Sequence, residues 1–206
     1  MNSTGLLTAL LALTVGGWPS LSAQETQKTQ DTQQMQEAPR LPRVATSPKA
    51  SVVQRIGLDT DITIVYSRPG VKGRKIWGEL VPYGLAPANQ YAPKPFPWRA
   101  GANATTTIEF SGPVKIQGKE LSAGKYGLHM IPDKDKDWII IFSKNSSGAG
   151  SFKYMEDEDA LRVTAKPVTE TTFTEWLEFG FENLSATGAT CYLRWEKLKI
   201  PFELSL

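Results

Sequence analysis

The chain has 206 residues, of which 40% are hydrophobic, and its 23 Lys and Arg nearly balance its 21 Asp and Glu. A formal net charge of +2 argues against a nucleic-acid-binding protein, because such proteins usually carry a strong basic excess on one face. The only thiol is Cys191, which excludes an intramolecular disulfide, so the fold depends on core burial.

The N-terminal residues predict two segments that precede the folded domain. The apolar run Leu6–Val15, followed by "GGWPSLSAQ", is typical of a signal peptide that spans residues 1–23. The run is shorter than the roughly 20 apolar residues that a membrane span needs, so no transmembrane segment is expected in the mature protein. Residues 24–45, rich in Gln and Thr, predict a disordered tether. We therefore expect an exported protein, periplasmic or extracellular, with one folded domain at 46–206.

Apolar and polar side chains alternate along much of that domain, which predicts β-strands with one buried face. Two stretches, "KYGLHMI" and "DWIIIF", are apolar on both faces and predict central strands joined by a hairpin turn at "PDKDKD". Pro201 lacks an N–H for the ladder, which predicts that the last strand lies at an edge or carries a bulge. The alternating stretches are "DITIVYS", "TTTIEF", "LRVTAK", "EWLEFGF", "CYLRWE" and "LKIPFEL".

The regular spacing of turns, with no helical period, predicts an all-β fold: an antiparallel two-sheet sandwich of about nine or ten strands, jelly-roll-like or immunoglobulin-like. One connection, residues 84–103, is unusually long and holds four prolines and three aromatic residues. Loops longer than about 12–15 residues are uncommon in compact domains and are often functional. The prolines lower the entropic cost of holding one shape.

Five motifs in order support a family resemblance: "SPKASV", "YSRPGVKGRKIWGELVPYG", "WRAGANATTTIEF", "AGKYGLHMIP" and "EDALRV". From Ser47 to Leu206 the chain resembles the exported bacterial family catalogued as domain of unknown function 2911. The resemblance implies an exported, all-β bacterial protein and no established activity. The chain departs from the family pattern by its Pro-rich insertion and by Ala149, where a Trp is common.

The second of these motifs is a cationic loop that includes Arg68 and Arg74. Its glycines allow backbone N–H groups to converge on an anion, and Arg binds carboxylate or phosphate through a planar fork. It lacks the GK[ST] of a phosphate loop, so no nucleotide site is predicted. Alternatively, the guanidinium groups pair with internal carboxylates, either Glu109 or the acidic run Glu156–Asp159.

Two further places suggest ligand contacts. In "WRAGAN", Trp98, Arg99 and Asn103 could stack on and hydrogen-bond a polar ring, or Trp98 could plug one end of the sandwich. His129, the only histidine, shares a strand face with Gly127, which is expected to leave space beside it for a ligand. A general base also needs an orienting carboxylate, which the sequence does not assign; the alternative is a core or rim histidine.

Metal chemistry is not predicted. One His and one Cys cannot build an ordinary zinc site, and Asp133–Asp137 has Trp138 and Lys144 where a calcium loop needs Gly and Glu. No cofactor is expected, and without a G-x-S-x-G motif Cys191 is interpreted as a core residue.

These patterns predict a non-catalytic exported β-sandwich that binds a small polar or anionic ligand, or an envelope glycan. One alternative is an exported hydrolase or isomerase that uses His129 with a carboxylate brought near by folding. The other is a protein-interaction module that docks a partner through sheet edges or the Pro-rich insertion. The predicted ligand-binding residues are Arg68, Arg74, Trp98, Arg99, Asn103 and His129.

Overall fold

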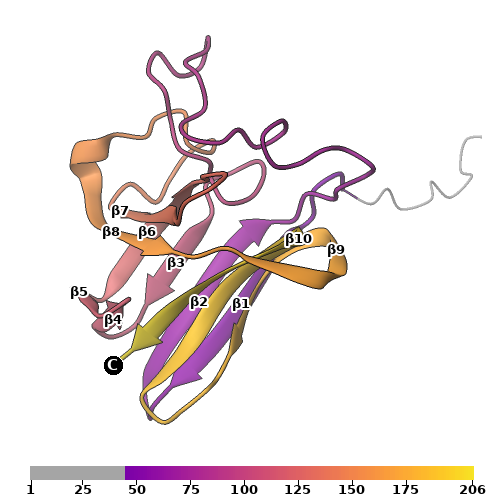
Figure 1. Ribbon diagram of the computed structural model, residues 1–206. Helices are drawn as coiled ribbons and strands as arrows, with labels where there is room; N and C mark the ends of the chain where they lie inside the picture. Colours follow the sequence, from indigo (N-terminus) through magenta and orange to yellow (C-terminus); the bar gives the residue numbers. More distant parts are fainter. Residues whose placement is uncertain (1–44) are drawn as a thin grey trace, which may run out of the picture. The chain divides into compact units, whose positions relative to one another are not determined.

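Ten β-strands and one short 3-10 helix follow one another along residues 45–206, the part of the chain that the computed structural model describes (Figure 1). The predicted signal peptide, and the predicted tether apart from Ala45, lie outside these residues. No helix in the described part is long and apolar enough to cross a membrane. The elements are β1 (Lys49–Ile56), β2 (Thr60–Ser67), β3 (Thr107–Phe110), β4 (Val114–Ile116), β5 (Lys119–Leu121), β6 (Gly124–Ile131), β7 (Trp138–Ser143), η1 (Glu156–Glu158), β8 (Asp159–Ala165), β9 (Val168–Glu182) and β10 (Gly188–Ser205).

The strands form two sheets, with strand orders β1-β2-β3-β6-β7-β8 and β5-β4-β10-β9. Every pair of neighbouring strands is antiparallel. This confirms the predicted all-β sandwich of two antiparallel sheets. The alternating apolar positions of β2 and β10, such as Ile62, Ile64 and Leu193, are fully buried in one core. Burial of each such side chain contributes about 1.5–3 kcal/mol.

The central strands β6 and β7 carry His129 and the hairpin that follows it. They are antiparallel neighbours inside the six-stranded sheet, as their two-sided apolar pattern predicts. The hairpin between them is closed by Asp133, whose Oδ1 accepts the backbone N–H groups of Asp135 and Lys136 at 2.9 Å each. The apparent calcium loop is therefore a turn. Even-numbered residues of β6, such as Leu128, face the sandwich core.

The two predicted strands "CYLRWE" and "LKIPFEL" are a single strand, β10. Their buried positions are odd-numbered up to Trp195 and even-numbered from Leu198 onwards. The pairing with β9 shifts on both sides of Glu196, which has a φ of 59°. Because a bulge inserts an extra residue, it reverses the parity of the strand and keeps both apolar halves on the core side.

Pro201 does not mark a sheet edge, because β10 lies between β4 and β9. Of the two alternatives predicted for this strand, the edge is wrong and the bulge is confirmed, since β10 carries one at Glu196. Pro201 follows Lys199, the last residue paired with β9, and precedes Leu204, the first paired with β4. At this position its missing N–H removes no bond from either ladder.

Candidate functional site

Two long segments lie at the same end of the sandwich (Figure 1). One is the Pro-rich loop, residues 84–98; the other is the β7–β8 connection, residues 144–158. The Pro-rich loop is held at both ends: the N–H of Gly84 donates to Pro132 O at 2.7 Å, and Trp98 and Met130 exchange two backbone hydrogen bonds of 2.8 Å. Within it, Ala86 and Phe96 exchange backbone bonds of 2.8 and 3.0 Å. With its prolines, the loop forms a preorganised wall.

The β7–β8 connection is anchored to the chain just before β3. The hydroxyl of Thr105 donates to Gly150 O at 2.7 Å, and the Thr105 N–H donates to Gly148 O at 3.2 Å. At its far end, the hydroxyl of Tyr154 donates to Asp159 Oδ2 at 2.7 Å, and Arg162 donates to the same hydroxyl oxygen at 2.6 Å. The connection is thus a second fixed wall.

A cavity of about 910 Å³ lies between the two walls. Four aromatic residues line it, Tyr91, Phe96, Phe152 and Tyr154. The ring centroid of Phe152 lies 5.6 Å from that of Tyr91 and 5.5 Å from that of Phe96. Tyr91 is 66% exposed. The cavity is within the size range of small-ligand sites. The charged residues that line it are Lys94, Lys153, Glu156, Asp157 and Arg162.

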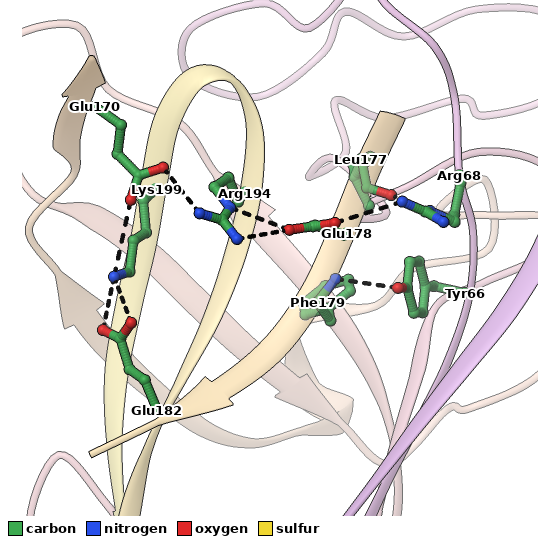
Figure 2. A network of polar contacts seen from close by, with 9 residues as sticks. All are labelled: Tyr66, Arg68, Glu170, Leu177, Glu178, Phe179, Glu182, Arg194 and Lys199. Atoms are coloured by element: carbon green, nitrogen blue, oxygen red, sulfur yellow. Dashed lines mark hydrogen bonds and ion pairs between the residues drawn. The ribbon is translucent and has the colours of Figure 1, made fainter. Parts of the chain in front are cut away.

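The cationic loop does not contribute its guanidinium groups to this cavity. Arg68 reaches across to β9, where its Nε donates to Leu177 O at 2.8 Å and its Nη2 lies 3.5 Å from Glu178 Oε2 (Figure 2). Arg74 folds back on its own loop and donates to Gly70 O at 2.6 Å. The alternative interpretation predicted that these guanidinium groups bind groups of the protein itself, as they do here. The carboxylates that it named, Glu109 and the acidic run Glu156–Asp159, are wrong, because the acid near Arg68 is Glu178.

Glu178 belongs to a half-buried network on β9 and β10. Besides Arg68, its carboxylate accepts two hydrogen bonds from Arg194, of 2.8 and 3.1 Å (Figure 2). Glu170 lies 3.4 Å from Arg194 and 3.9 Å from Lys199. The network joins the cationic loop to the four-stranded sheet, so its charges serve the fold.

Trp98 is packed inside the end of the sandwich. Its ring is stacked on Trp195, with the planes 15° apart, and meets Trp77 edge-on with centroids 5.8 Å apart. Its Nε1 donates to Gly101 O at 3.2 Å. Asn103 donates to Ser47 O at 3.3 Å and so ties the segment to the residues before β1. These contacts give Trp98 and Asn103 structural roles.

Arg99 contacts a ring of the cavity lining. Its guanidinium carbon is 5.0 Å from the ring centroid of Phe152, and Nη1 donates to Asn103 O at 2.7 Å. Among the described residues no carboxylate forms an ion pair with Arg99. Burial lowers the pKa of Arg99.

His129 lies beneath the β7–β8 connection and is 2% exposed. Its Nδ1 is 2.7 Å from Ser151 Oγ, and its ring meets that of Tyr154 edge-on. Burial, together with the positive charge of Arg99, lowers the pKa of His129 to about 4. The pocket beside it, of about 10 Å³, has room for one water molecule.

The expectation that Gly127 leaves space for a ligand is wrong. A Cβ at Gly127 would collide with Asn145 O and would lie 3.1 Å from His129 Nε2 and 3.3 Å from Thr105. The backbone of the β7–β8 connection occupies the place of the missing side chain. Gly127 therefore permits close packing of two chain segments.

The comparisons with known proteins now bear on identity. The profile of a family of proteins of unknown function, DUF2911, matches residues 47–204. The chain belongs to the DUF2911 family. No curated protein and no solved structure matches it. The family assignment confirms the resemblance carried by the five sequence motifs, and it assigns no activity.

None of the six predicted ligand-binding residues lines the cavity of this DUF2911 protein. Tyr91 and Phe96 lie in the Pro-rich loop, and Phe152 and Lys153 follow "NSSGAG" in the β7–β8 connection. The available signal was an aromatic residue exposed on a loop stiffened by proline, since such a ring is costly to leave in water without a partner. Among residues 45–206 no group of three or more His, Cys, Asp or Glu side chains is placed to hold a metal ion.

Proposed function

We propose that this DUF2911 protein is a non-catalytic binding module that holds a saccharide between the Pro-rich loop and the β7–β8 connection. One observation carries the proposal: a cavity of about 910 Å³ is lined both by aromatic rings and by charged side chains. Sugar rings present apolar faces and polar edges, so they suit a site in which a few polar groups orient a ligand against apolar walls.

The aromatic contacts are preorganised for such a ligand. Tyr91 is held by the backbone pairing of Asn89 with Ala92, through bonds of 2.8 and 3.1 Å. The carboxamide oxygen of Asn89 also accepts the Tyr91 N–H at 2.8 Å. These bonds fix the backbone, and the ring itself lies 5.6 Å from that of Phe152, so less conformational entropy is lost when a ligand stacks on it. These contacts support the assignment of Tyr91 to the ligand rather than to the core.

Several observations favour binding over catalysis. The ring of His129 is sealed beneath the connection, and its Nδ1 lies 2.7 Å from the hydroxyl oxygen of Ser151. Within residues 45–206 no Asp or Glu hydrogen-bonds to this ring. A histidine with a pKa of about 4 is a weak base near neutral pH. The alternative of a hydrolase or isomerase centred on His129 is therefore disfavoured.

The proposed ligand is an envelope or extracellular saccharide, because residues 1–23 are predicted to direct export. Isothermal titration calorimetry of the full-length mature chain against soluble oligosaccharides tests the proposal. We expect Tyr91→Ala to lower saccharide affinity about tenfold or more, as loss of an anchor ring does.

The matched control is Phe173→Ala. Phe173 is also an exposed aromatic residue, 49% accessible, but it lies on β9 outside the cavity lining. Its replacement should leave the affinity unchanged. Equal affinities of the Tyr91 and Phe173 variants would contradict the proposed site, and absence of saccharide binding by the folded wild-type protein would reject the function.

A further inference from the structure

The charges that line the cavity divide into those used by the fold and those left available. Arg162 lies 3.2 Å from Glu156 and 2.5 Å from Asp159, so one guanidinium group is shared by two carboxylates. Lys94, Lys153 and Asp157 have no ion pair with another described residue. Two lysines without an ion pair therefore stand at the lining beside one such acid, Asp157, while Arg162, Glu156 and Asp159 together carry one net negative charge.

The two available cations come from different walls. Lys94 belongs to the Pro-rich loop, between Pro93 and Pro95, whose fixed φ angles limit the backbone there. Lys153 belongs to the β7–β8 connection and follows Phe152 directly. The two lysines that line the cavity therefore come from opposite walls.

A third cation lies behind the aromatic lining. Arg99 contacts Phe152, a cavity-lining ring, and no described carboxylate neutralises it. The depressed pKa of the neighbouring His129 is in keeping with a positive charge that acts on its surroundings, in addition to burial. In a partly enclosed cavity such charges attract an anion more strongly than they would in bulk water.

We propose that the saccharide taken by this cavity is acidic, and that Lys94 and Lys153 hold its anionic group while Tyr91, Phe96 and Phe152 contact the ring. The inference rests on the proposed saccharide function and narrows it to sugars that carry a carboxylate or a sulfate. Lysine ammonium groups suit both anions because each is a point charge with three donors.

The test compares three probes against the full-length mature chain by calorimetry: a galacturonate tetrasaccharide, its neutral methyl ester, and a sulfated tetrasaccharide with the same backbone. We expect the acid to bind about tenfold more tightly than the ester, with a preference that weakens as salt is raised. Of the two anionic probes, the one bound more tightly identifies the anion.

Lys94→Gln and Lys153→Gln should each lower affinity for the anionic probe about threefold to fivefold, and the double variant should abolish its preference over the ester. Lys144→Gln is the matched control, because Lys144 is an exposed lysine of the same connection outside the cavity lining. Its affinities should equal those of the wild type.

The failures of the two proposals are distinguishable. If acid and ester bind equally, or if the double variant keeps the preference, the anionic subsite is overturned while the saccharide site stands. If none of the three probes, nor any neutral oligosaccharide, binds the folded protein, the saccharide function itself is rejected.

Discussion

The cationic loop and the cavity walls both contain basic residues, but the basic side chains of the loop bind groups of the protein itself, whereas those of the walls border the cavity. In the loop, Arg68 and Arg74 donate to carbonyl oxygens and to Glu178, which are parts of the protein itself. At the cavity, Lys94 and Lys153 line open space without an internal acid. A charge already satisfied by the fold has little left to offer a ligand, since binding must first break the internal contact.

The aromatic residues show the same contrast. Trp77, in the cationic loop, and Trp98, at the end of the Pro-rich loop, pack together and against Trp195. Tyr91 and Phe96 extend beyond this cluster and meet Phe152 at the cavity. The tryptophans fix the walls, and the tyrosine and phenylalanines are left to line the space between them.

The largest expected effect on stability comes from replacing Trp195, the buried residue against which Trp77 of the cationic loop and Trp98 of the Pro-rich loop both pack. Trp195 is 1% exposed, stacks on Trp98, and donates from Nε1 to Glu175 O at 3.3 Å. Trp195→Ala should lower the free energy of unfolding by about 3–5 kcal/mol, because it leaves a large cavity in the core. Urea unfolding measures the change.

Trp195→Phe is the control for this prediction and should cost less, because it keeps an aromatic ring in the same place. A loss below about 1 kcal/mol for Trp195→Ala would mean that packing on Trp195 does not hold the cationic loop and the Pro-rich loop in place.

Much of the fold could be predicted because its signal is local. Alternation with period two predicts which side of a strand is buried, and this prediction is confirmed for β2 and for Leu177 and Phe179 of β9. The pattern apolar on both faces likewise predicted β6 and β7 as central strands. The single strand β10 was read as two, because the bulge at Glu196 reverses the parity of the pattern. A bulge is set by pairing with a neighbouring strand, which periodicity alone does not contain.

The candidate site was less predictable because it depends on long-range pairing. Charge and glycine content singled out Arg68, but its partner Glu178 lies 110 positions further along the chain. The surroundings of Gly127 were also unpredictable, because the backbone of Asn145, from a different strand connection, occupies the place of its missing side chain. The sequence shows which groups carry chemistry, and the tertiary contacts decide which of them stay available.

The second prediction concerns the pH dependence of stability, which reports how burial and the charge of Arg99 lower the pKa of His129. Among the described residues no carboxylate pairs with Arg99. The pKa of His129 is about 4 in the folded protein, against 6.5 for an unperturbed histidine. Between these values the unfolded chain binds more protons than the folded one, so stability falls as pH is lowered from about 6.5 to about 4. The loss should approach 1.4 kcal/mol per pH unit, or roughly 3 kcal/mol in all.

The measurement is urea unfolding at about pH 7 and about pH 4.5, for wild type and His129→Gln. The variant should lose less stability than the wild type between the two pH values, because its side chain does not titrate. Arg99→Gln should fall between them, since it removes the charge but not the burial that lowers the pKa. Identical pH dependence in all three proteins would show that His129 does not report this charge.

The smallest expected effect on stability comes from Glu178→Gln, which tests whether the cationic loop takes part in ligand binding. Glu178 faces both Arg68 and Arg194, and its side chain is 30% exposed. Glu178→Gln removes the charge that both guanidinium groups share, and it should cost about 1–2 kcal/mol of stability, reduced by partial solvent screening. Saccharide affinity should be unchanged, because Glu178 and Arg68 are absent from the cavity lining.

Glu79→Gln is the matched control within the same cationic loop. Glu79 pairs with Lys75 at 2.9 Å, but its side chain is 60% exposed, so its loss should change stability by less than about 0.5 kcal/mol. The decisive outcome is the pair of readouts for Glu178→Gln. If it weakened saccharide binding as much as Tyr91→Ala does, the cationic loop would belong to the binding site, because loosening its internal pairing would then reach the ligand.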